Sequence, residues 1–240
     1  MVDSRAMGSE TGVQGGVREA ADAGPPAIAF FDLDGTLVLG QTQRLLVGFL
    51  RRRGMVSRRF LVGAGLWFAL YKTGLVKATD RARARGAELL AGHSEVEVGR
   101  LMDLFTNELL VARLNQAVVA ALQDHKARGD QVVILSAAVQ PLVRSLGGRL
   151  AVEACEGTRL ETVQGRYTGS LAGRALYGAE KARAARRYLE KSGVDPARCW
   201  AYADHETDLE LLRLVGWPVA VRPRPALRKV ALAEGWSIVP

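Results

Sequence analysis

Short apolar runs that end in polar or turn residues recur along the chain. An uninterrupted run of this kind is typical of a strand buried on both faces of a parallel sheet. Helical periodicity fills the stretches between several runs, and this alternation predicts an α/β fold with a Rossmann-like parallel sheet. The predicted strands are Ala27–Phe31, Gln131–Ser136, Cys199–Ala203, Gly216–Val221 and Gly235–Val239, and the clearest helices are Leu114–Arg128, one opening at Tyr177–Lys181, and Pro225–Leu232.

The first apolar run leads directly into two carboxylates. Ala27–Phe31 is followed by Asp32, and Asp34 comes two residues later, before Gly35. Residues two apart in an extended chain point the same way, and ligands of parallel sheets bind outside the carboxyl ends of the strands. Two close carboxylates repel each other unless a cation or a shared proton relieves the repulsion. An Asp-Gly turn would explain Gly35, but it would not explain Asp32, an acid at the edge of a core strand. Asp32 therefore indicates a functional site.

Residues 41–113 have a helical pattern that is rich in arginine. Within them Phe60–Tyr71 carries no charge and is too short to span a bilayer, which needs about 20 residues. Apolar runs of this length are usually buried, so a core helix of a small bundle is favoured. An interfacial helix whose flanking arginines meet anionic lipid is the alternative. Two further helices are expected over Thr79–Leu90 and Ser94–Val111, the second opened by a capping box with Glu97.

The net charge and the spacing of the cysteines limit the kinds of partner and the cell compartment that we expect. A formal charge of +8 and a pI near 9.9 favour anionic partners. The chain lacks the interleaved basic and aromatic residues of a nucleic-acid module, so no nucleic-acid partner is expected. Cys155 and Cys199 form neither a CxxC nor a metal-type spacing, which favours reduced thiols in a reducing cytoplasm. Residues 1–26 lack the apolar core of a signal peptide and predict a disordered lead-in to a cytoplasmic protein.

Three more polar residues occupy special places beside the predicted elements. Ser136 ends the second strand, Lys181 opposes the dipole at a helix start, and Asp204 opens an Asp-x-x-x-Asp sequence after a strand. The stretch Phe31–Leu37 fits the pattern apolar-Asp-x-Asp-x-Thr. These four motifs, in this order, resemble those of the haloacid dehalogenase superfamily. The helical insert after the first motif is similar to that of its phosphoserine-phosphatase-like branch.

The resemblance covers residues 27–240 and implies two domains. Residues 27–40 and 114–240 would form the core with the haloacid dehalogenase fold, and residues 41–113 would form an inserted α-helical cap domain. We call residues 41–113 the cap; in this branch the cap closes over the site and selects the substrate. A hairpin is expected at Glu161–Leu171, with Gln164 and Gly165 in its turn.

The resemblance also implies a reaction, the hydrolysis of a phosphomonoester with Mg²⁺ as cofactor. Asp32 would attack phosphorus and form an aspartyl-phosphate, and Asp34 would act as general acid and base. Mg²⁺ prefers oxygen ligands and keeps several waters, so two carboxylates and a backbone carbonyl can hold it. The implied metal residues are Asp32, Asp204 and, through its carbonyl, Asp34, with Asp208 behind them; the implied phosphate-binding residues are Ser136, Ala137 and Lys181.

Three classes of function stay open at this point. A phosphatase that acts on a small phosphorylated metabolite is favoured. A membrane-surface phosphatase for a lipid phosphate is the second class, because Phe60–Tyr71 is apolar and flanked by arginines. A phosphate-binding protein without catalysis is disfavoured, because every residue that the reaction needs is present.

Substrate choice depends on residues that the resemblance only outlines. In phosphoserine phosphatases a carboxylate nine residues after the nucleophile receives the substrate's ammonium group, and here that position is Gln41. Arg83 and Arg85 in the cap are candidates to hold a substrate carboxylate. His205 follows Asp204 where the superfamily more often has Ser, so it inherits no role.

Overall fold

The computed structural model describes residues 26–56, 63 and 86–240. Its main sheet has six strands, all parallel, in the order β3-β2-β1-β6-β7-β8. This arrangement confirms the predicted α/β fold with a Rossmann-like core. The strands are β1 (Ile28–Phe31), β2 (Gln131–Val139), β3 (Ala154–Thr158), β6 (Trp200–Ala203), β7 (Trp217–Val221) and β8 (Ser237–Val239).

Strand β1 is buried on both faces, as its apolar run predicts. Ala29 and Phe31 belong to one hydrophobic cluster, while Ile28 and Phe30 belong to a second cluster on the opposite face. The first cluster includes α5 (Gln116–Ala127) and α6 (Gln140–Arg149), and the second includes α7 (Ala179–Ser192), α8 (Leu209–Leu212) and α9 (Pro225–Ala233). Because β2 and β6 flank β1, strand order reverses there, and such a point is where parallel sheets bind ligands.

Neither α6 nor β3 was predicted from the sequence, because glycines interrupt their apolar patterns. A Cβ at Gly147 would collide with the Cys155 sulfur, and a Cβ at Gly157 would lie 2.7 Å from the Ala138 carbonyl. The amide of Gly157 donates to the Gln140 side chain at 2.5 Å. These glycines are therefore needed for the close approach of α6, β2 and β3. They also interrupt the apolar pattern by which a helix or strand is recognised in the sequence.

The described part of the cap packs against the core. Helix α1 (Thr42–Arg52) contacts α4 (Glu95–Phe105) through Phe49 and Phe105, whose ring centroids lie 5.2 Å apart. Both rings belong to the same buried cluster as Phe31. The capping box that opens α4 is confirmed, but the predicted helix to Val111 widens into a π-helical turn at Thr106–Leu110. Residues 60–71, apart from Gly63, and most of Thr79–Leu90 lie outside the described residues.

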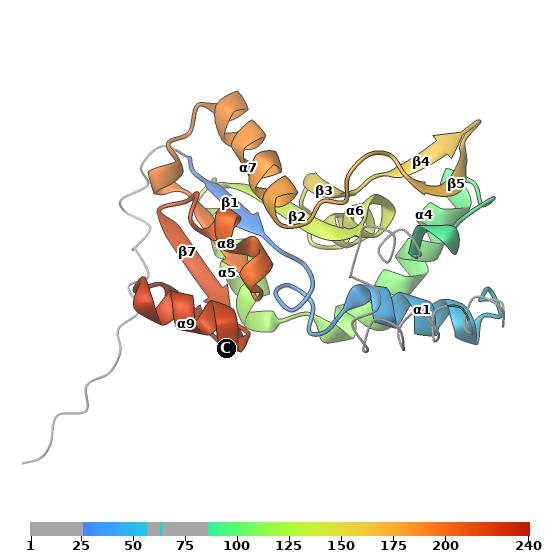
Figure 1. The fold of residues 1–240 in the computed structure, drawn as a ribbon, viewed down its shortest axis with the longest axis horizontal. Coiled ribbons are helices and arrows are strands. Elements are labelled where there is room, and N and C mark those ends of the chain that lie inside the picture. Colours follow the sequence, from blue (N-terminus) through green and yellow to red (C-terminus); the bar gives the residue numbers. More distant parts are fainter. Residues whose placement is uncertain (1–25, 57–62, 64–85) are drawn as a thin grey trace, which may run out of the picture.

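The predicted hairpin is confirmed as β4 (Leu160–Val163) and β5 (Arg166–Leu171). Its turn residues Gln164 and Gly165 have φ values of 50° and 72°, which explains the glycine. The hairpin also bonds to the start of α4: the Glu95 amide donates to the Gly165 carbonyl at 3.0 Å. Figure 1 accordingly shows the hairpin beside α4, beyond the sheet. The division into core and cap domains stays a prediction.

The helices of the described residues include none with the length and hydropathy needed to cross a bilayer. Residues 1–25, predicted as a disordered lead-in, lie outside the described residues.

A buried hydrogen-bonded chain runs beneath the strand that carries Asp32. His125, on α5, has Nδ1 2.7 Å from Asp130 Oδ2 and Nε2 2.9 Å from the Tyr202 hydroxyl. The Tyr202 ring stacks on Phe31 with centroids 4.4 Å apart. Burial lowers the pKa of His125 by more than the hydrogen bond to Asp130 raises it. The imidazole is therefore neutral in the folded protein near neutral pH.

This neutral imidazole predicts a loss of stability in mild acid. As the pH falls below about 6.5, His125 gains a proton in the unfolded chain before it does in the folded one, so the free energy of unfolding falls. Burial raises the pKa of Asp34 and Asp204, and these groups act in the opposite direction. The measurement is therefore the difference between native protein and His125→Gln in denaturant unfolding from pH 5 to 8. A pH-independent difference would contradict the account.

Candidate active site

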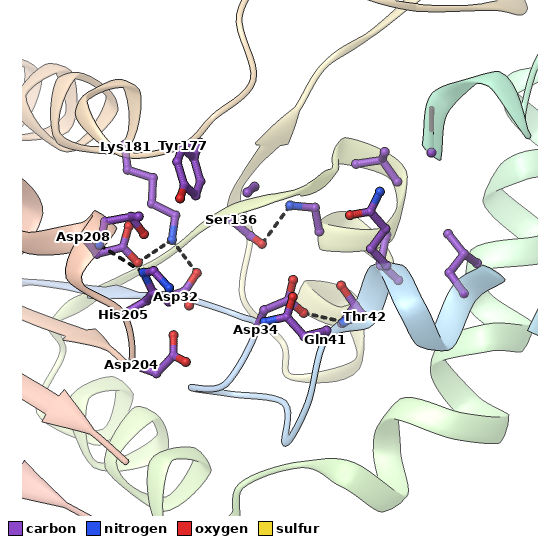
Figure 2. A pocket seen from close by; sticks show the side chains of 18 of the residues that line it. Asp32, Asp34, Gln41, Thr42, Ser136, Tyr177, Lys181, Asp204, His205 and Asp208 are labelled. Atoms are coloured by element: carbon purple, nitrogen blue, oxygen red, sulfur yellow. Dashed lines mark hydrogen bonds and ion pairs between the residues drawn. The ribbon is translucent and has the colours of Figure 1, made fainter. Parts of the chain in front are cut away.

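A cavity of about 280 Å³ lies outside the carboxyl ends of β1, β2 and β6 (Figure 2). It is the place where the sequence analysis expected the four motifs to meet. Its wall contains the motif residues Asp32, Asp34, Ser136, Ala137, Lys181, Asp204 and Asp208, and also Gln41, Thr42, Gln43, Leu46, Gly86, Ala138, Val139, Leu142, Tyr177, His205, Thr207 and Arg224. Four segments that are distant in the sequence therefore supply one site.

Asp32 stands at the end of β1 and is held on three sides. Its amide donates to the Tyr202 carbonyl at 3.0 Å, which extends the β1–β6 pairing by one residue. Lys181 Nζ lies 2.5 Å from Asp32 Oδ1, and the Thr36 hydroxyl donates to Asp32 Oδ2 at 3.3 Å. The carboxylate is buried, with 4% of the residue exposed. Thr36 is thus the motif residue that fixes the second carboxylate oxygen.

Lys181 joins two buried aspartates. It lies in the first turn of α7, and its Nζ donates to Asp208 Oδ2 at 2.9 Å as well as to Asp32 (Figure 2). Burial alone would lower the pKa of Lys181, but the neighbouring charges of Asp32 and Asp208 raise it overall. Burial likewise pushes the pKa of Asp32 up while Lys181 pulls it back. The lysine therefore keeps its positive charge despite the unfavourable helix end.

Asp34 interacts with the first helix of the cap. The Thr42 amide donates to Asp34 Oδ1 at 2.7 Å, at the N-terminus of α1. The side chain of Gln41, which precedes α1, makes no capping bond, so Asp34 provides the acceptor and the negative charge that a helix N-terminus favours. Burial raises the pKa of Asp34 to about 6, although the bond from Thr42 opposes this rise. A carboxyl group with this pKa can both donate and accept a proton near neutral pH.

Asp204 lies against the loop that carries Asp34. A Cβ at Gly35 would collide with Asp204 Oδ2, and Gly35 has a φ of 82°. The peptide between Asp34 and Gly35 therefore lies beside the Asp204 carboxylate. Burial, followed by the charge of Asp32, raises the pKa of Asp204 to about 7, and Arg224 Nε lies 3.9 Å from Oδ2. Asp204, the nearby Asp32 and this backbone segment therefore converge at one place, with Arg224 at the edge of ion-pairing distance from Asp204.

The residues present fit a hard divalent cation. Their donors are all oxygens, and burial together with the charge of Asp32 makes ionised Asp204 unfavourable unless a further cation binds. Asp208 Oδ1 is buried and has no hydrogen-bond partner among the described residues. No three His, Cys, Asp or Glu side chains in that part of the chain enclose a metal ion by themselves. A site with two carboxylates, a carbonyl and waters agrees with that finding, and it is typical of Mg²⁺ rather than zinc.

Ser136 and Ala137 lie where β2 leaves its ladder. The pairing with β3 shifts register between Leu135 and Val139, which frees the intervening backbone at the cavity. The Ser136 oxygen accepts from the Ala138 amide at 3.1 Å. The Ser136 hydroxyl proton can therefore be donated to an anion, and Ala137 lies beside it in the cavity wall. The strand was predicted to end at Ser136, but its pairing with β3 resumes after the irregularity, at Val139.

His205 has a local structural role. Its Nδ1 accepts from the Thr207 amide at 3.2 Å and caps the 3₁₀ turn Glu206–Asp208. Burial lowers the pKa of His205, so the ring is neutral and its Nδ1 can act as an acceptor. The side chain also lines the cavity. Sequence analysis assigned it no function.

Several cavity residues were not predicted. Thr42, Gln43, Tyr177 and Arg224 belong to no motif, and Thr207 is one of the unspecified positions of the fourth motif. Two of them could have been suspected from their neighbours in the sequence. Thr42 follows Gln41, and Tyr177 lies one helical turn before Lys181. Gln41 lies in the wall as expected, whereas Arg83 and Arg85 lie outside the described residues.

Comparisons with known proteins agree with this geometry. Residues 29–213 match the family model described as haloacid dehalogenase-like hydrolase. The chain is 32% identical to the Mycobacterium tuberculosis protein named phosphoserine phosphatase SerB1, over 91% of this chain and 73% of that protein. It is 26% identical to a protein named histidinol-phosphatase from Neisseria meningitidis, over 88% and 97%. A crystal structure of a Bordetella pertussis protein of unknown function has a TM-score of 0.79 at 27% identity, covering 90% of this chain and 98% of that one. The chain therefore belongs to the haloacid dehalogenase-like hydrolase family, and within that family to the phosphatases that resemble phosphoserine phosphatase.

Proposed function

We propose that the protein is a Mg²⁺-dependent phosphatase that hydrolyses a small phosphomonoester through an aspartyl-phosphate on Asp32. One observation carries the proposal: Asp32, Asp34 and Asp204 converge on one cavity, with Lys181 on Asp32 and the Thr42 amide on Asp34. A binding protein would have no need of a second carboxyl group poised near neutral pH beside a buried, oriented nucleophile. The non-catalytic alternative is disfavoured for this reason.

The reaction divides one displacement into two. An Asp32 carboxylate oxygen attacks phosphorus, the bond from phosphorus to the ester oxygen breaks, and Asp34 gives its proton to the departing alkoxide. Asp34 then takes a proton from water as the water oxygen attacks the same phosphorus. The bond between phosphorus and Asp32 breaks, and inorganic phosphate leaves. The pKa of about 6 suits Asp34 to both proton transfers.

Positioning of the phosphate oxygens supplies much of the catalysis in phosphoryl transfer. Lys181, the Ser136 hydroxyl and the Ala137 amide would hold these oxygens. Asp32, Asp204 and the Asp34 carbonyl would hold Mg²⁺, with Asp208 supporting the site through Lys181. When bound, the metal would neutralise the carboxylates and the phosphate, which otherwise repel each other.

The same proposal makes residues 41–113 a cap that helps to select the leaving group. The side of the cavity wall that comes from the cap is formed by Gln41, Thr42, Gln43, Leu46 and Gly86. The relatives named phosphoserine phosphatase and histidinol-phosphatase support a small phosphorylated metabolite as the substrate. A cytoplasmic location and the lack of a nucleic-acid partner stay expectations from the sequence. The lipid-phosphate alternative depends on Phe60–Tyr71, which lies outside the described residues apart from Gly63.

A substrate panel tests this proposal. Soluble phosphomonoesters and a phosphorylated lipid in liposomes are offered with and without Mg²⁺. We expect phosphate release from soluble esters that depends on Mg²⁺. Release from the liposomes alone would favour the membrane-surface phosphatase, and no release from any ester would contradict a phosphatase.

Gln41 predicts that free phosphoserine is a poor substrate. An amide offers no charge to a substrate ammonium group, and a hydrogen bond to a charged partner is worth more than a neutral one. The deaminated analogue of phosphoserine should therefore have the higher kcat/KM in the native protein. Gln41→Glu should shift the ratio toward phosphoserine by about 10-fold or more. The matched control is Gln43→Glu, which adds the same charge to the cavity wall. A phosphoserine preference that Gln41→Glu leaves unchanged would contradict this assignment.

A further inference from the structure

Arg224 is a positive side chain in the cavity wall whose N–H groups are not used within the described part of the protein. It lines the cavity, and its side chain is 49% exposed. The acid that it faces is Asp204, but Arg224 Nε lies 3.9 Å from Asp204 Oδ2, beyond hydrogen-bond distance. The guanidinium makes no hydrogen bond to any other described residue. Its donors are therefore available to a ligand in the cavity.

The backbone fixes the point from which this side chain starts. Arg224 lies between Pro223 and Pro225, immediately before α9, with φ −62° and ψ 158°. Proline restricts its own φ and the conformation of the residue before it, so both neighbours limit the backbone here. The Arg224 amide also donates to the Asp204 carbonyl at 3.0 Å. The segment after β7 therefore presents an arginine beside the carboxyl end of β6.

The other positive side chain of the described wall is Lys181, because the His205 ring is neutral. Lys181 already donates to Asp32 at 2.5 Å and to Asp208 at 2.9 Å, so two carboxylates balance its charge. Arg224 has no such close partner. A phosphate dianion that enters a wall rich in aspartates needs positive charge and several donors. Among the described residues, Arg224 is the cation whose donors can turn fully to that dianion.

Arg224 and the nucleophile Asp32 act on the same neighbours. Burial has the largest effect on the pKa of Asp204 and of His205, and beyond burial Asp32 raises and Arg224 lowers both pKa values. The two charges therefore lie near the same part of the wall. A volume of about 280 Å³ is also small for a ligand pocket. A phosphoryl group at Asp32 thus comes within reach of a long, half-exposed arginine side chain.

We propose that Arg224 binds the phosphoryl group of the substrate and the phosphate product, as a second positive contact beside Lys181. The planar guanidinium offers paired N–H donors that match two phosphate oxygens at once. This inference rests on the proposed function, because it takes Asp32 as the place where phosphorus binds. It adds a phosphate-binding residue that follows β7 and lies outside the four motifs.

Inorganic phosphate is the probe that tests the proposal. Its binding is measured at saturating Mg²⁺, by inhibition of p-nitrophenyl phosphate turnover and by titration calorimetry. Arg224→Gln should weaken it by about 5- to 10-fold, which lies between the worth of an exposed ion pair and that of a hydrogen bond to a charged group. Arg224→Lys keeps the charge without the paired donors and should recover part of the loss.

The matched control is Arg228→Gln. Arg228 is exposed one helical turn further along α9 and does not line the cavity, so phosphate binding should stay within about two-fold of the native value. The two glutamine variants remove the same charge from the same helix. A loss that appears in Arg224→Gln alone therefore reports a contact in the cavity rather than the net charge of the protein.

Phosphate binding that Arg224→Gln leaves unchanged would overturn the proposal. An arginine that only balances Asp204 would produce this result, and the variant would change only the Mg²⁺ concentration that raises the melting temperature. An arginine that holds an anionic group of the leaving alcohol would instead change the ratio of kcat/KM between 2-phosphoglycolate and ethyl phosphate. A native protein that hydrolyses no phosphomonoester would refute the proposed function, while calorimetry with phosphate would still decide the role of Arg224.

Discussion

Replacing Asp32 by asparagine should abolish turnover and leave the fold intact. An amide cannot form the acyl phosphate, and loss of an essential nucleophile usually lowers kcat by well over 100-fold. The new side chain has the same shape, and Lys181 keeps Asp208 as a partner at 2.9 Å. The circular dichroism spectrum should therefore match that of the native protein. The measurement is kcat with the best ester of the substrate panel.

The matched control for this variant is Asp124→Asn. Asp124 is exposed on α5 and does not line the cavity, so the same chemical change there should leave kcat within about two-fold. If Asp32→Asn kept more than about 1% of the native kcat, Asp32 would not be the nucleophile.

Removing divalent metal should stop the reaction, and adding Mg²⁺ should restore it. Without the cation, the phosphate dianion meets the carboxylates of Asp32, Asp34 and Asp204 in one buried cavity. Ca²⁺ should substitute poorly, because its longer and more flexible coordination misplaces the groups of an in-line displacement. Asp204→Asn removes one ligand charge and should raise the Mg²⁺ concentration needed for half-maximal activity.

The measurement is activity against free Mg²⁺ concentration after treatment with EDTA, together with thermal unfolding. Mg²⁺ should raise the melting temperature of the native protein more than that of Asp204→Asn, since a ligand stabilises the state it binds. Full activity in excess EDTA would mean that the carboxylates have another purpose.

The strands of the sheet other than β3, and the motif positions, could be predicted because local sequence determines them. The apolar run of β1 needs no partner to be recognised, and the residues after it must lie at the carboxyl edge of the sheet. The turn at Gln164 and Gly165 and the capping box at Ser94 likewise depend on neighbours in the sequence. For these features, the backbone conformation is the one that the local residue types favour.

The remaining features depend on contacts between distant residues. Gly147 and Gly157 look like breaks in a pattern until the approach of Cys155 and Ala138 explains them. Nothing near His125 in the sequence points to Tyr202, 77 residues away. The bond from Thr42 to Asp34 spans eight residues but crosses from the cap to the core. A capping acid is normally sought immediately before the helix, where Gln41 stands.

The covalent intermediate on Asp32 is the central claim, and Asp34→Asn offers a way to trap it. p-Nitrophenolate leaves without an acid, so this variant should still form the aspartyl-phosphate but should lack the base that activates water. Acid quenching followed by peptide mass spectrometry should find one phosphoryl group on Asp32, with a burst of about one p-nitrophenolate per protein molecule. Continued release of p-nitrophenolate with Asp32 unmodified, or a phosphoryl group on another residue, would contradict the account.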